Sequence, residues 1–167
     1  MTSRAGAADI PHDGEMKTPD RLRRRASRLL SQMSGLSDRL MNDGLAQVDA
    51  RKWHYAVLAS LQEFGPCSQA TLSRRTGIYR SDMVGVLNEL AERDLIERAL
   101  DPDDRRRNVI TITPQGRRHL RRLDKVLDEL HDELLAPLTP AERDQFVQLL
   151  TRLLDHHTQQ TPHPSIP

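Results

Sequence analysis

Apolar residues recur every three or four positions through most of the chain, which predicts amphipathic α-helices. This spacing defines six helical segments, at about residues 18–41, 49–63, 68–76, 79–92, 114–135 and 140–157. Between the fourth and fifth segments the pattern changes to alternation of apolar and polar residues, which is typical of half-buried β-strands. We therefore predict a mainly α protein with one small β-hairpin.

The predicted hairpin has a strongly basic tip. Its turn opens at Pro102 and ends in three consecutive arginines, Arg105, Arg106 and Arg107. Alternation over residues 109–113 supplies the second strand. Guanidinium groups at such a tip suit phosphate contacts and insertion into a narrow, electronegative minor groove of DNA. The pattern therefore indicates the wing of a winged helix-turn-helix.

The two short helical segments before the hairpin have the pattern of a helix-turn-helix. Ser68 is placed to cap the first segment, and Gly77 supplies a tight turn between the two. The apolar face of the second segment is predicted to be buried through Met83, Val86, Leu87 and Leu90. Polar and small residues on the other face permit close approach to base edges. That face carries Arg80, Ser81, Val84, Gly85 and Asn88.

The outer helical segments are longer than the core of a winged helix requires. Apolar residues follow at spacings of four and three through residues 22–40, and a similar row runs through residues 120–134. Such rows are typical of helices that pack against a partner, so we predict a homodimer. Packing within one chain is the alternative. A single domain over 18–157 would comprise dimerisation helices at 18–48 and 114–157 and a DNA-binding lobe at 49–113, with disordered tails at 1–17 and 158–167.

Local signals set further boundaries and buried faces. Gly44 is expected to separate the first two helices. Thr113 and Thr139, each followed by proline, are expected to cap the last two. The faces expected to be buried comprise Trp53, Val57, Leu58 and Leu61 in the second helix, and Phe146, Leu149, Leu150 and Leu153 in the sixth.

Composition narrows the class of protein. The chain has 167 residues, a formal net charge of +1 and 3% aromatic residues, which suits a helical protein better than a β-sandwich. The positive and negative charges are separated along the chain although they nearly cancel in the net charge. Six basic residues lie in 17–28 and four acidic residues lie in 128–133. The sequence has no apolar run that could span a membrane, no secretory signal and one cysteine. We therefore expect a cytoplasmic protein with no membrane partner.

Catalytic and metal-binding motifs are not recognisable in the sequence. It contains no glycine-rich phosphate loop, no Gly-x-Ser-x-Gly elbow and no useful pairing of cysteine with histidine. Asp128 and His131 share one helical face, but no second pair completes a metal site. We expect no enzyme activity, no metal and no other cofactor.

Over residues 20–157 the chain resembles the MarR family of bacterial transcriptional regulators. The order of elements agrees, and residues 91–98 resemble the family's segment between recognition helix and wing, although Asp94 stands where glycine is common. The most specific match is Asp104-Arg105-Arg106, followed by Val109, Ile110, Ile112, Thr113 and Gly116, with Ile112 in place of leucine.

The resemblance implies how this chain would bind DNA. Arg106 would enter the minor groove, oriented by a charge-assisted hydrogen bond that it donates to Asp104, while Arg105 and Arg107 would contact phosphates. The polar face of the second helix of the helix-turn-helix would lie in the major groove. Residues near the DNA backbone would be Ser68 and Thr71. A homodimer would bind an operator with an inverted repeat, and repression is the expected effect.

The resemblance also implies a small, often phenolic or aromatic, effector between the dimerisation helices and the DNA-binding lobe. Trp53, His54 and Tyr55 each offer a ring and a polar group to such a pocket, although core packing explains Trp53 equally well. Cys67 precedes a helix N-terminus, which can lower a thiol pKa. A redox-responsive regulator acting through Cys67 is therefore one alternative, and a helical interaction protein that does not bind DNA is another.

Overall fold

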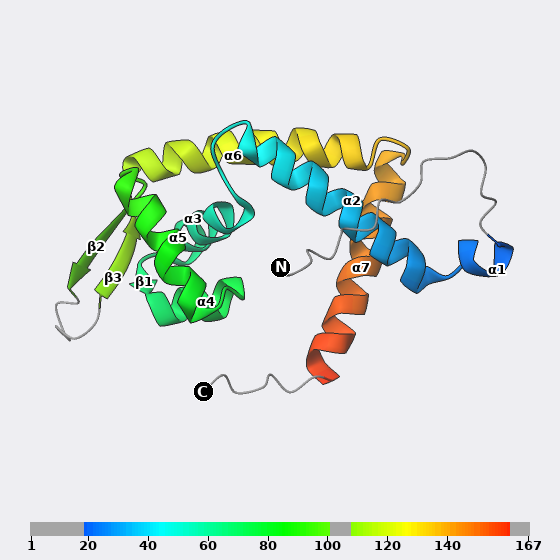
Figure 1. Cartoon of the computed structure of the whole chain (residues 1–167), viewed down its shortest axis with the longest axis horizontal. Helices are drawn as coiled ribbons and strands as arrows, with labels where there is room; N and C mark the ends of the chain where they lie inside the picture. The colour runs from blue at the N-terminus through cyan, green and yellow to red at the C-terminus, as the bar shows by residue number, and fades with distance from the viewer. Residues whose placement is uncertain (1–18, 101–107, 161–167) are drawn as a thin grey trace, which may run out of the picture. The chain divides into compact units, whose positions relative to one another are not determined.

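The computed structural model describes residues 19–100 and 108–160 (Figure 1). The chain divides into two compact units, Met1–Leu36 and Ser37–Pro167, and each is described by itself. The described residues are mostly helical with a small sheet, which confirms the predicted fold class. The elements in chain order are α1 (Asp20–Arg23), α2 (Ala26–Ala46), α3 (Lys52–Phe64), β1 (Cys67–Ser68), α4 (Gln69–Thr76), α5 (Arg80–Glu92), β2 (Ile96–Leu100), β3 (Asn108–Ile112), α6 (Pro114–Leu134) and α7 (Pro140–Gln160).

The first predicted helix is divided in two, so the prediction of one continuous helix over 18–41 is wrong. α1 is a single turn with no buried residue, and α2 begins after a break at Arg24. So short a turn contributes little buried surface, and its contacts include an ion pair between Arg23 and Asp20 at 3.9 Å. The prediction that Gly44 ends the helix is also wrong. A Cβ on Gly44 would lie 2.5 Å from Cδ1 of Leu130, so this glycine permits close packing of α2 on α6, and the chain turns instead at Asp49 with φ 52°.

α4 and α5 form the predicted helix-turn-helix pair. The backbone N–H of Thr71 donates to Oγ of Ser68 at 3.3 Å, which confirms Ser68 as the N-cap of α4. Gly77 ends α4 in the left-handed region at φ 71°, a conformation that glycine adopts without steric cost. The predicted cap at Ser68 and the predicted turn at Gly77 are therefore both confirmed.

The sheet is antiparallel, with the order β1-β3-β2. Its hairpin pairs Ile96 with Ile112 at the base and Leu100 with Asn108 toward the tip. β1 was not expected, because two residues carry no periodic pattern. It pairs Cys67 with Ile110, and this pairing attaches the start of α4 to the hairpin.

Side-chain caps begin the last two helices at the predicted residues. Oγ1 of Thr113 accepts from the backbone N–H of Gly116 at 2.9 Å, with Pro114 in the first turn. Before α7, Oε2 of Glu142 accepts from the backbone N–H of Thr139 at 2.8 Å, and Thr139 accepts in return from Glu142, so the capping box is confirmed. α7 continues to Gln160, beyond the predicted end at 157.

The hydrophobic core belongs to the second unit and joins α3, α4, α5, the sheet and the first half of α6. Its fully buried side chains include Val57, Leu58, Leu61, Leu72, Met83, Leu87, Leu90, Ile110 and Leu123. Leu123 and the neighbouring Leu120 come from the row over 120–134. The core of the helix-turn-helix and sheet therefore uses part of a row that the sequence analysis assigned to dimerisation.

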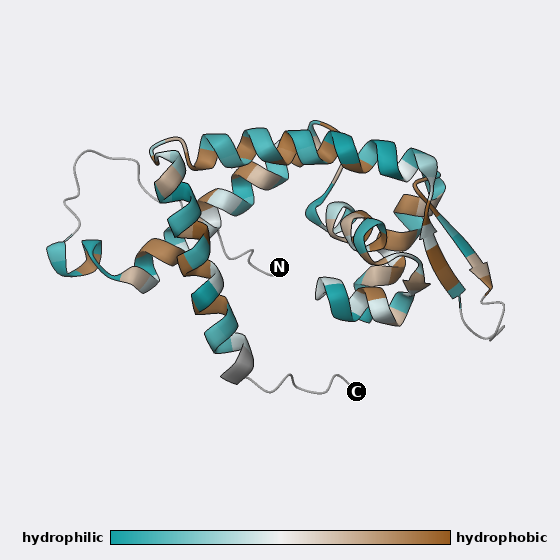
Figure 2. Ribbon diagram, turned by 180° about the vertical axis from the view of Figure 1, so that it is seen from behind, coloured by the Kyte–Doolittle hydropathy of each residue, from teal (hydrophilic) through white to brown (hydrophobic). Residues whose placement is uncertain are grey.

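Residues of α7 with described side chains, 140–158, include no buried one within the single chain. The ribbon of this helix carries both hydrophobic and hydrophilic residues (Figure 2). Leu149 and Leu153 are exposed, while Phe146 and Leu150 are only partly covered, so the prediction that these four are buried is wrong for one chain. Helix periodicity identifies an apolar face but not what covers it. In the first unit, Leu29, Met33 and Leu36 of α2 are also exposed. None of the helices in ranges 19–100 and 108–160 is both long and apolar enough to cross a membrane.

Candidate nucleic-acid interface

The turn between α4 and α5 is held by hydrogen bonds from side chain to backbone. Oγ of Ser73 donates to the carbonyl of Ile78 at 2.5 Å, and Oγ1 of Thr76 donates to the carbonyl of Leu72 at 2.7 Å. Ile78 is itself buried in the core. These contacts place the start of α5 firmly relative to α4.

α5 has one buried face and one exposed face. Met83, Leu87 and Leu90 are fully buried as predicted, whereas Val86 is only partly buried. A Cβ built on Gly85 would meet no atom within 4 Å, so the backbone is open to an approaching ligand there. The prediction of an exposed polar and small face is confirmed for Arg80, Ser81, Val84, Gly85 and Asn88.

Ser68 and Thr71 lie together at the start of α4. Their hydroxyl oxygens are 3.1 Å apart, and Nη2 of Arg74 donates to Oγ1 of Thr71 at 3.4 Å. With Asn108 of β3, these residues line a hollow of about 400 Å³. The expected role of Ser68 and Thr71 beside a DNA backbone stays a prediction.

The predicted wing residues Asp104, Arg105, Arg106 and Arg107 lie outside the described residues. The strands that lead to them are described, and β2 is exposed from Glu97 to Leu100. Nη2 of Arg98 in β2 donates to Oδ1 of Asn88 in α5 at 2.8 Å. The hairpin is thus connected by a side chain to the exposed face of the second helix.

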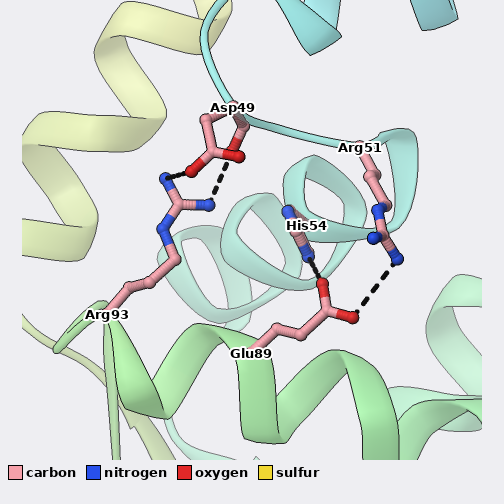
Figure 3. Close-up of polar contacts among 5 residues, drawn as sticks. All are labelled: Asp49, Arg51, His54, Glu89 and Arg93. Atoms are coloured by element: carbon pink, nitrogen blue, oxygen red, sulfur yellow. Dashed lines mark hydrogen bonds and ion pairs between the residues drawn. The ribbon is translucent and has the colours of Figure 1, made fainter.

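A second group of polar residues gathers around Glu89 of α5, at the edge of the exposed face (Figure 3). Nε2 of His54 lies 2.9 Å from Oε2 of Glu89, and Nη1 of Arg51 lies 3.2 Å from Oε1 of the same carboxylate. A carboxylate only accepts hydrogen bonds, so Nε2 of His54 carries the proton. Arg93 adds a link to the loop before α3, because Nη1 donates to the carbonyl of Asp49 at 2.6 Å and Nη2 lies 3.6 Å from its carboxylate.

Two buried histidines accompany this group. His54 is only 3% exposed, and its Nδ1 has no hydrogen-bond partner among the described residues; the same holds for Nε2 of buried His119 on α6. Burial lowers the pKa of His54 below its ordinary value of 6.5, while Glu89 opposes this shift. Burial, followed by the charges of Arg93 and Arg122, lowers the pKa of His119 as well. Both rings therefore favour the neutral form.

A cavity of about 490 Å³ adjoins these residues between the end of α2, α3 and α5. Of the three predicted pocket residues, His54 lines it, whereas Trp53 and Tyr55 do not. Consecutive helical residues point about 100° apart, so three in a row cannot share one wall. The cavity is lined by Asn42, Ala46, Asp49, Ala50, Arg51, His54, Glu89, Glu92 and Arg93.

Trp53 and Tyr55 occupy other surroundings. Trp53 is 39% exposed, with Nζ of Lys52 lying 5.2 Å from its ring centroid, so the prediction that it is buried beside Val57 is wrong. His54 takes that inward position. Tyr55 donates from its hydroxyl to Oδ1 of Asp124 at 3.1 Å. Burial and this hydrogen bond raise the pKa of Tyr55 above 10.0.

The structure gives Cys67 the surroundings of an unreactive thiol. It lies in β1 rather than on the first turn of α4, and burial raises the pKa of its thiol above 9.0, partly opposed by Arg75. This shift is opposite to the one that a helix N-terminus could produce, so it supports a structural role for Cys67 and does not favour the alternative of a redox-responsive regulator. Within 19–100 and 108–160, no three His, Cys, Asp or Glu side chains gather as metal ligands would.

Several residues of these two regions were missed by sequence reasoning. Tyr79, 66% exposed, precedes the first residue of α5, and its place directly before the second helix of the predicted helix-turn-helix was a usable signal. Glu89, Arg93 and Arg98 offered none, because their partners lie 35, 44 and 10 residues away in the sequence. Such pairs become apparent only when the helices are packed.

The geometry is that of a winged helix-turn-helix protein. Comparison with known proteins identifies the family within this class. The sequence profile of the MarR family matches residues 46–107. A solved structure of a probable transcriptional regulator from Pseudomonas aeruginosa is 32% identical and covers 79% of this chain and 98% of its own, with a TM-score of 0.70. The chain therefore belongs to the MarR family.

Two further relatives bear on function. A protein of Thauera aromatica, whose name links it to transcriptional regulation of the hcr operon, is 34% identical over 99 residues. The match spans 59% of this chain and only 60% of that relative. A structure of Bordetella bronchiseptica BpsR, concerned with regulation of its DNA binding by 6-hydroxynicotinic acid, is 26% identical, covers 79% of this chain and 94% of its own, and has a TM-score of 0.70.

Proposed function

We propose that this chain is a DNA-binding transcriptional repressor. The observation that carries the proposal is the exposed face of α5, where Arg80, Ser81, Val84, Gly85 and Asn88 lie opposite fully buried Met83, Leu87 and Leu90. Donors and small residues on the second helix of a rigid helix-turn-helix suit the major groove. Ser68 and Thr71 then lie near the DNA backbone, and the regulatory names of the relatives agree with this reading.

The repressor acts as a homodimer on an inverted repeat. Exposed leucines on α2 and α7, including Leu29, Leu36, Leu153 and Leu154, leave apolar area that a second copy can cover. Two recognition helices about 34–36 Å apart reach successive major grooves on one face of the duplex. A dimer seated on its operator blocks polymerase without further contacts, which is why repression is the expected sign.

The wing completes the interface. Arg106 is proposed to enter the minor groove with Asp104 as its orienting partner, while Arg105 and Arg107 contact phosphates. The support is the position of these residues between β2 and β3, whose pairing brings both strands to the same tip.

A small aromatic acid is proposed as the effector that releases DNA. The cavity beside His54 offers the guanidinium groups of Arg51 and Arg93 and the ring of a histidine to an aromatic acid. The carboxylate of such a ligand would take the place of Glu89 or Asp49, which pair with these two arginines in the free protein. Relief from repression requires that the ligand bind the DNA-incompetent form more tightly. The effect of 6-hydroxynicotinic acid on the relative BpsR makes that compound a sensible first probe.

A selection from a randomised duplex library tests DNA binding. The parent protein should enrich an inverted repeat, and Arg80→Ala should weaken binding to that duplex by at least about tenfold. Arg121→Ala removes the same charge from an exposed position on α6 and should have a much smaller effect. Failure of the parent to enrich any sequence contradicts the proposed function.

Light scattering and ligand titration test the two remaining parts. Leu153→Lys should convert a dimer to a monomer, whereas Gln148→Lys, also on α7 and exposed, should not. A series of aromatic acids should release DNA from the parent protein in a duplex titration. Arg51→Ala should raise the concentration needed for release, and release by none of the acids would contradict the assigned effector class.

A further inference from the structure

The hydrogen bond between Arg98 and Asn88 joins the wing to the face of α5 that is proposed to meet the bases. Nη2 of Arg98 lies 2.8 Å from Oδ1 of Asn88, which is a short, charge-assisted contact. Both side chains are exposed, and no core contact requires them to pair. The bond therefore acts on how the Asn88 amide is presented to its surroundings.

The orientation of this amide follows from the chemistry of its partner. A guanidinium group has only donors, so the atom that faces Arg98 must be the oxygen of Asn88. The nitrogen of the amide, with its two donors, then points away from β2. The bond to Arg98 thus prevents the Asn88 amide from rotating so that its oxygen and nitrogen change places.

This orientation changes which base the amide can read. Asparagine commonly reads adenine through two bonds, accepting from N6 through its oxygen and donating to N7 through its nitrogen. With the oxygen held by a cation, the first of these bonds is weakened. Guanine offers two acceptors on its major-groove edge, N7 and O6, which suit an amide that presents only donors.

Small residues next to Asn88 allow the required approach. Gly85 lies three residues earlier on the same exposed face and has open space around it, so the backbone does not hold the bases away. Val84, one turn before Asn88, is also exposed. Asn88 can therefore reach a base edge directly.

We propose that Arg98 is a positioning residue that makes Asn88 read guanine in preference to adenine. The inference rests on the proposed DNA binding and adds a specificity element that joins wing and recognition helix. Arg98 itself need not contact the DNA. Its effect is to hold the amide oxygen so that only donors face the base.

The test is a set of parallel selections from a randomised duplex library with the parent, Asn88→Ala, Arg98→Met and Arg98→Lys. The position where Asn88→Ala loses its base preference identifies the base pair that Asn88 reads. At that position the parent should prefer guanine. Arg98→Met should shift the ratio of guanine to adenine by about tenfold toward adenine, and Arg98→Lys, which keeps a charged donor, should retain most of the guanine preference.

Binding curves at several salt concentrations separate this role from others. An Arg98→Met protein that loses affinity equally for all duplexes, with a smaller salt dependence, would show a phosphate contact and overturn the inference. An unchanged guanine preference, or adenine preference in the parent, would overturn it too. Arg121→Met controls for loss of one charge, and thermal unfolding of each variant verifies that the fold is retained. If the parent selects no duplex, the proposed DNA binding fails and this inference fails with it.

Discussion

Nε2 of His54 lies 2.9 Å from Oε2 of Glu89, and this polar contact joins the buried side of α3 to α5 (Figure 3). Arg51 holds the other carboxylate oxygen at 3.2 Å. Glu89 therefore stands between the lobe's interior and the cavity beside it. A change in this contact reaches α5 one turn from Gly85, on the face that is proposed to touch DNA.

Removal of the Glu89 carboxylate should destabilise the fold. In Glu89→Ala both nitrogens of His54 are buried without a partner, which we expect to lower the free energy of unfolding by about 1–3 kcal/mol. Chemical denaturation measures this change. Glu92→Ala, an acidic residue on the same helix and cavity, is the matched control and should cost less than about 0.5 kcal/mol. Equal costs for the two variants would contradict the assigned role of the pair.

The two buried histidines make stability fall in mild acid. Their pKa values lie below 6.5 in the folded state because burial penalises the charged ring. Below pH 6.5 the unfolded chain therefore binds protons that the folded chain does not, and the free energy of unfolding decreases. The slope is at most about 1.4 kcal/mol per pH unit for each histidine. Above pH 6.5 their contribution is complete.

Denaturation at pH values from 5 to 8 tests this dependence. The slope between pH 5 and 6.5 should be smaller in His54→Gln than in the parent, whatever the absolute loss of stability. A slope of opposite sign would mean that the histidines gain protons on folding.

Gly116 has no room for a side chain. A Cβ at this position would overlap the carbonyl oxygen of Leu95 and lie 2.9 Å from Cγ1 of Ile112. The oxygen belongs to the backbone and already accepts from the N–H of Thr113 at 3.1 Å, so it cannot move freely. We expect Gly116→Ala to lower the free energy of unfolding by about 2–3 kcal/mol, as measured by denaturation. Wild-type stability in this variant would show that α6 can shift to make room.

Gly85→Ala should have opposite effects on stability and on DNA binding. The position is helical, and a Cβ there meets nothing within 4 Å, so alanine should raise stability by about 0.5–1 kcal/mol. The same methyl group would stand between α5 and the bases and weaken binding to the selected duplex. Thermal unfolding and duplex titration measure the two effects. Unaltered DNA affinity would place the DNA-binding face elsewhere on the protein.

Substitution of Arg105 and of Arg106 should affect DNA binding in different ways. Arg106→Ala should weaken binding to the selected duplex by about 1–3 kcal/mol, because a charge-assisted contact in a narrow groove is lost. Arg105→Ala should weaken all duplexes alike and reduce the salt slope by about one. Titrations at several salt concentrations distinguish them. Equal affinity of Arg106→Ala and parent protein would contradict the minor-groove role.

Glycine illustrates the limit of sequence reasoning in this chain. Gly77 and Gly44 look alike as helix ends in the sequence. Gly77 does end α4, with φ 71°, whereas Gly44 continues α2 and makes room for Leu130. The difference arises because the first role depends on a local conformation and the second on a helix 86 positions further along the chain. Asp94 is a further example. It adopts a positive φ of 54° at a position where glycine is common in the MarR family.

The sequence by itself determined the features that depend on neighbouring residues. The caps at Ser68, Thr113 and Thr139 and the apolar face of α5 follow from bonds and spacings within a few positions. Tertiary structure alone decided that His54 rather than Trp53 faces inward. Both residues border the apolar face of α3, and the elements packed against this helix determine which of the two is buried. Tertiary structure also decided that Glu89 pairs with His54 and Arg98 with Asn88, since such contacts require elements that folding brings together.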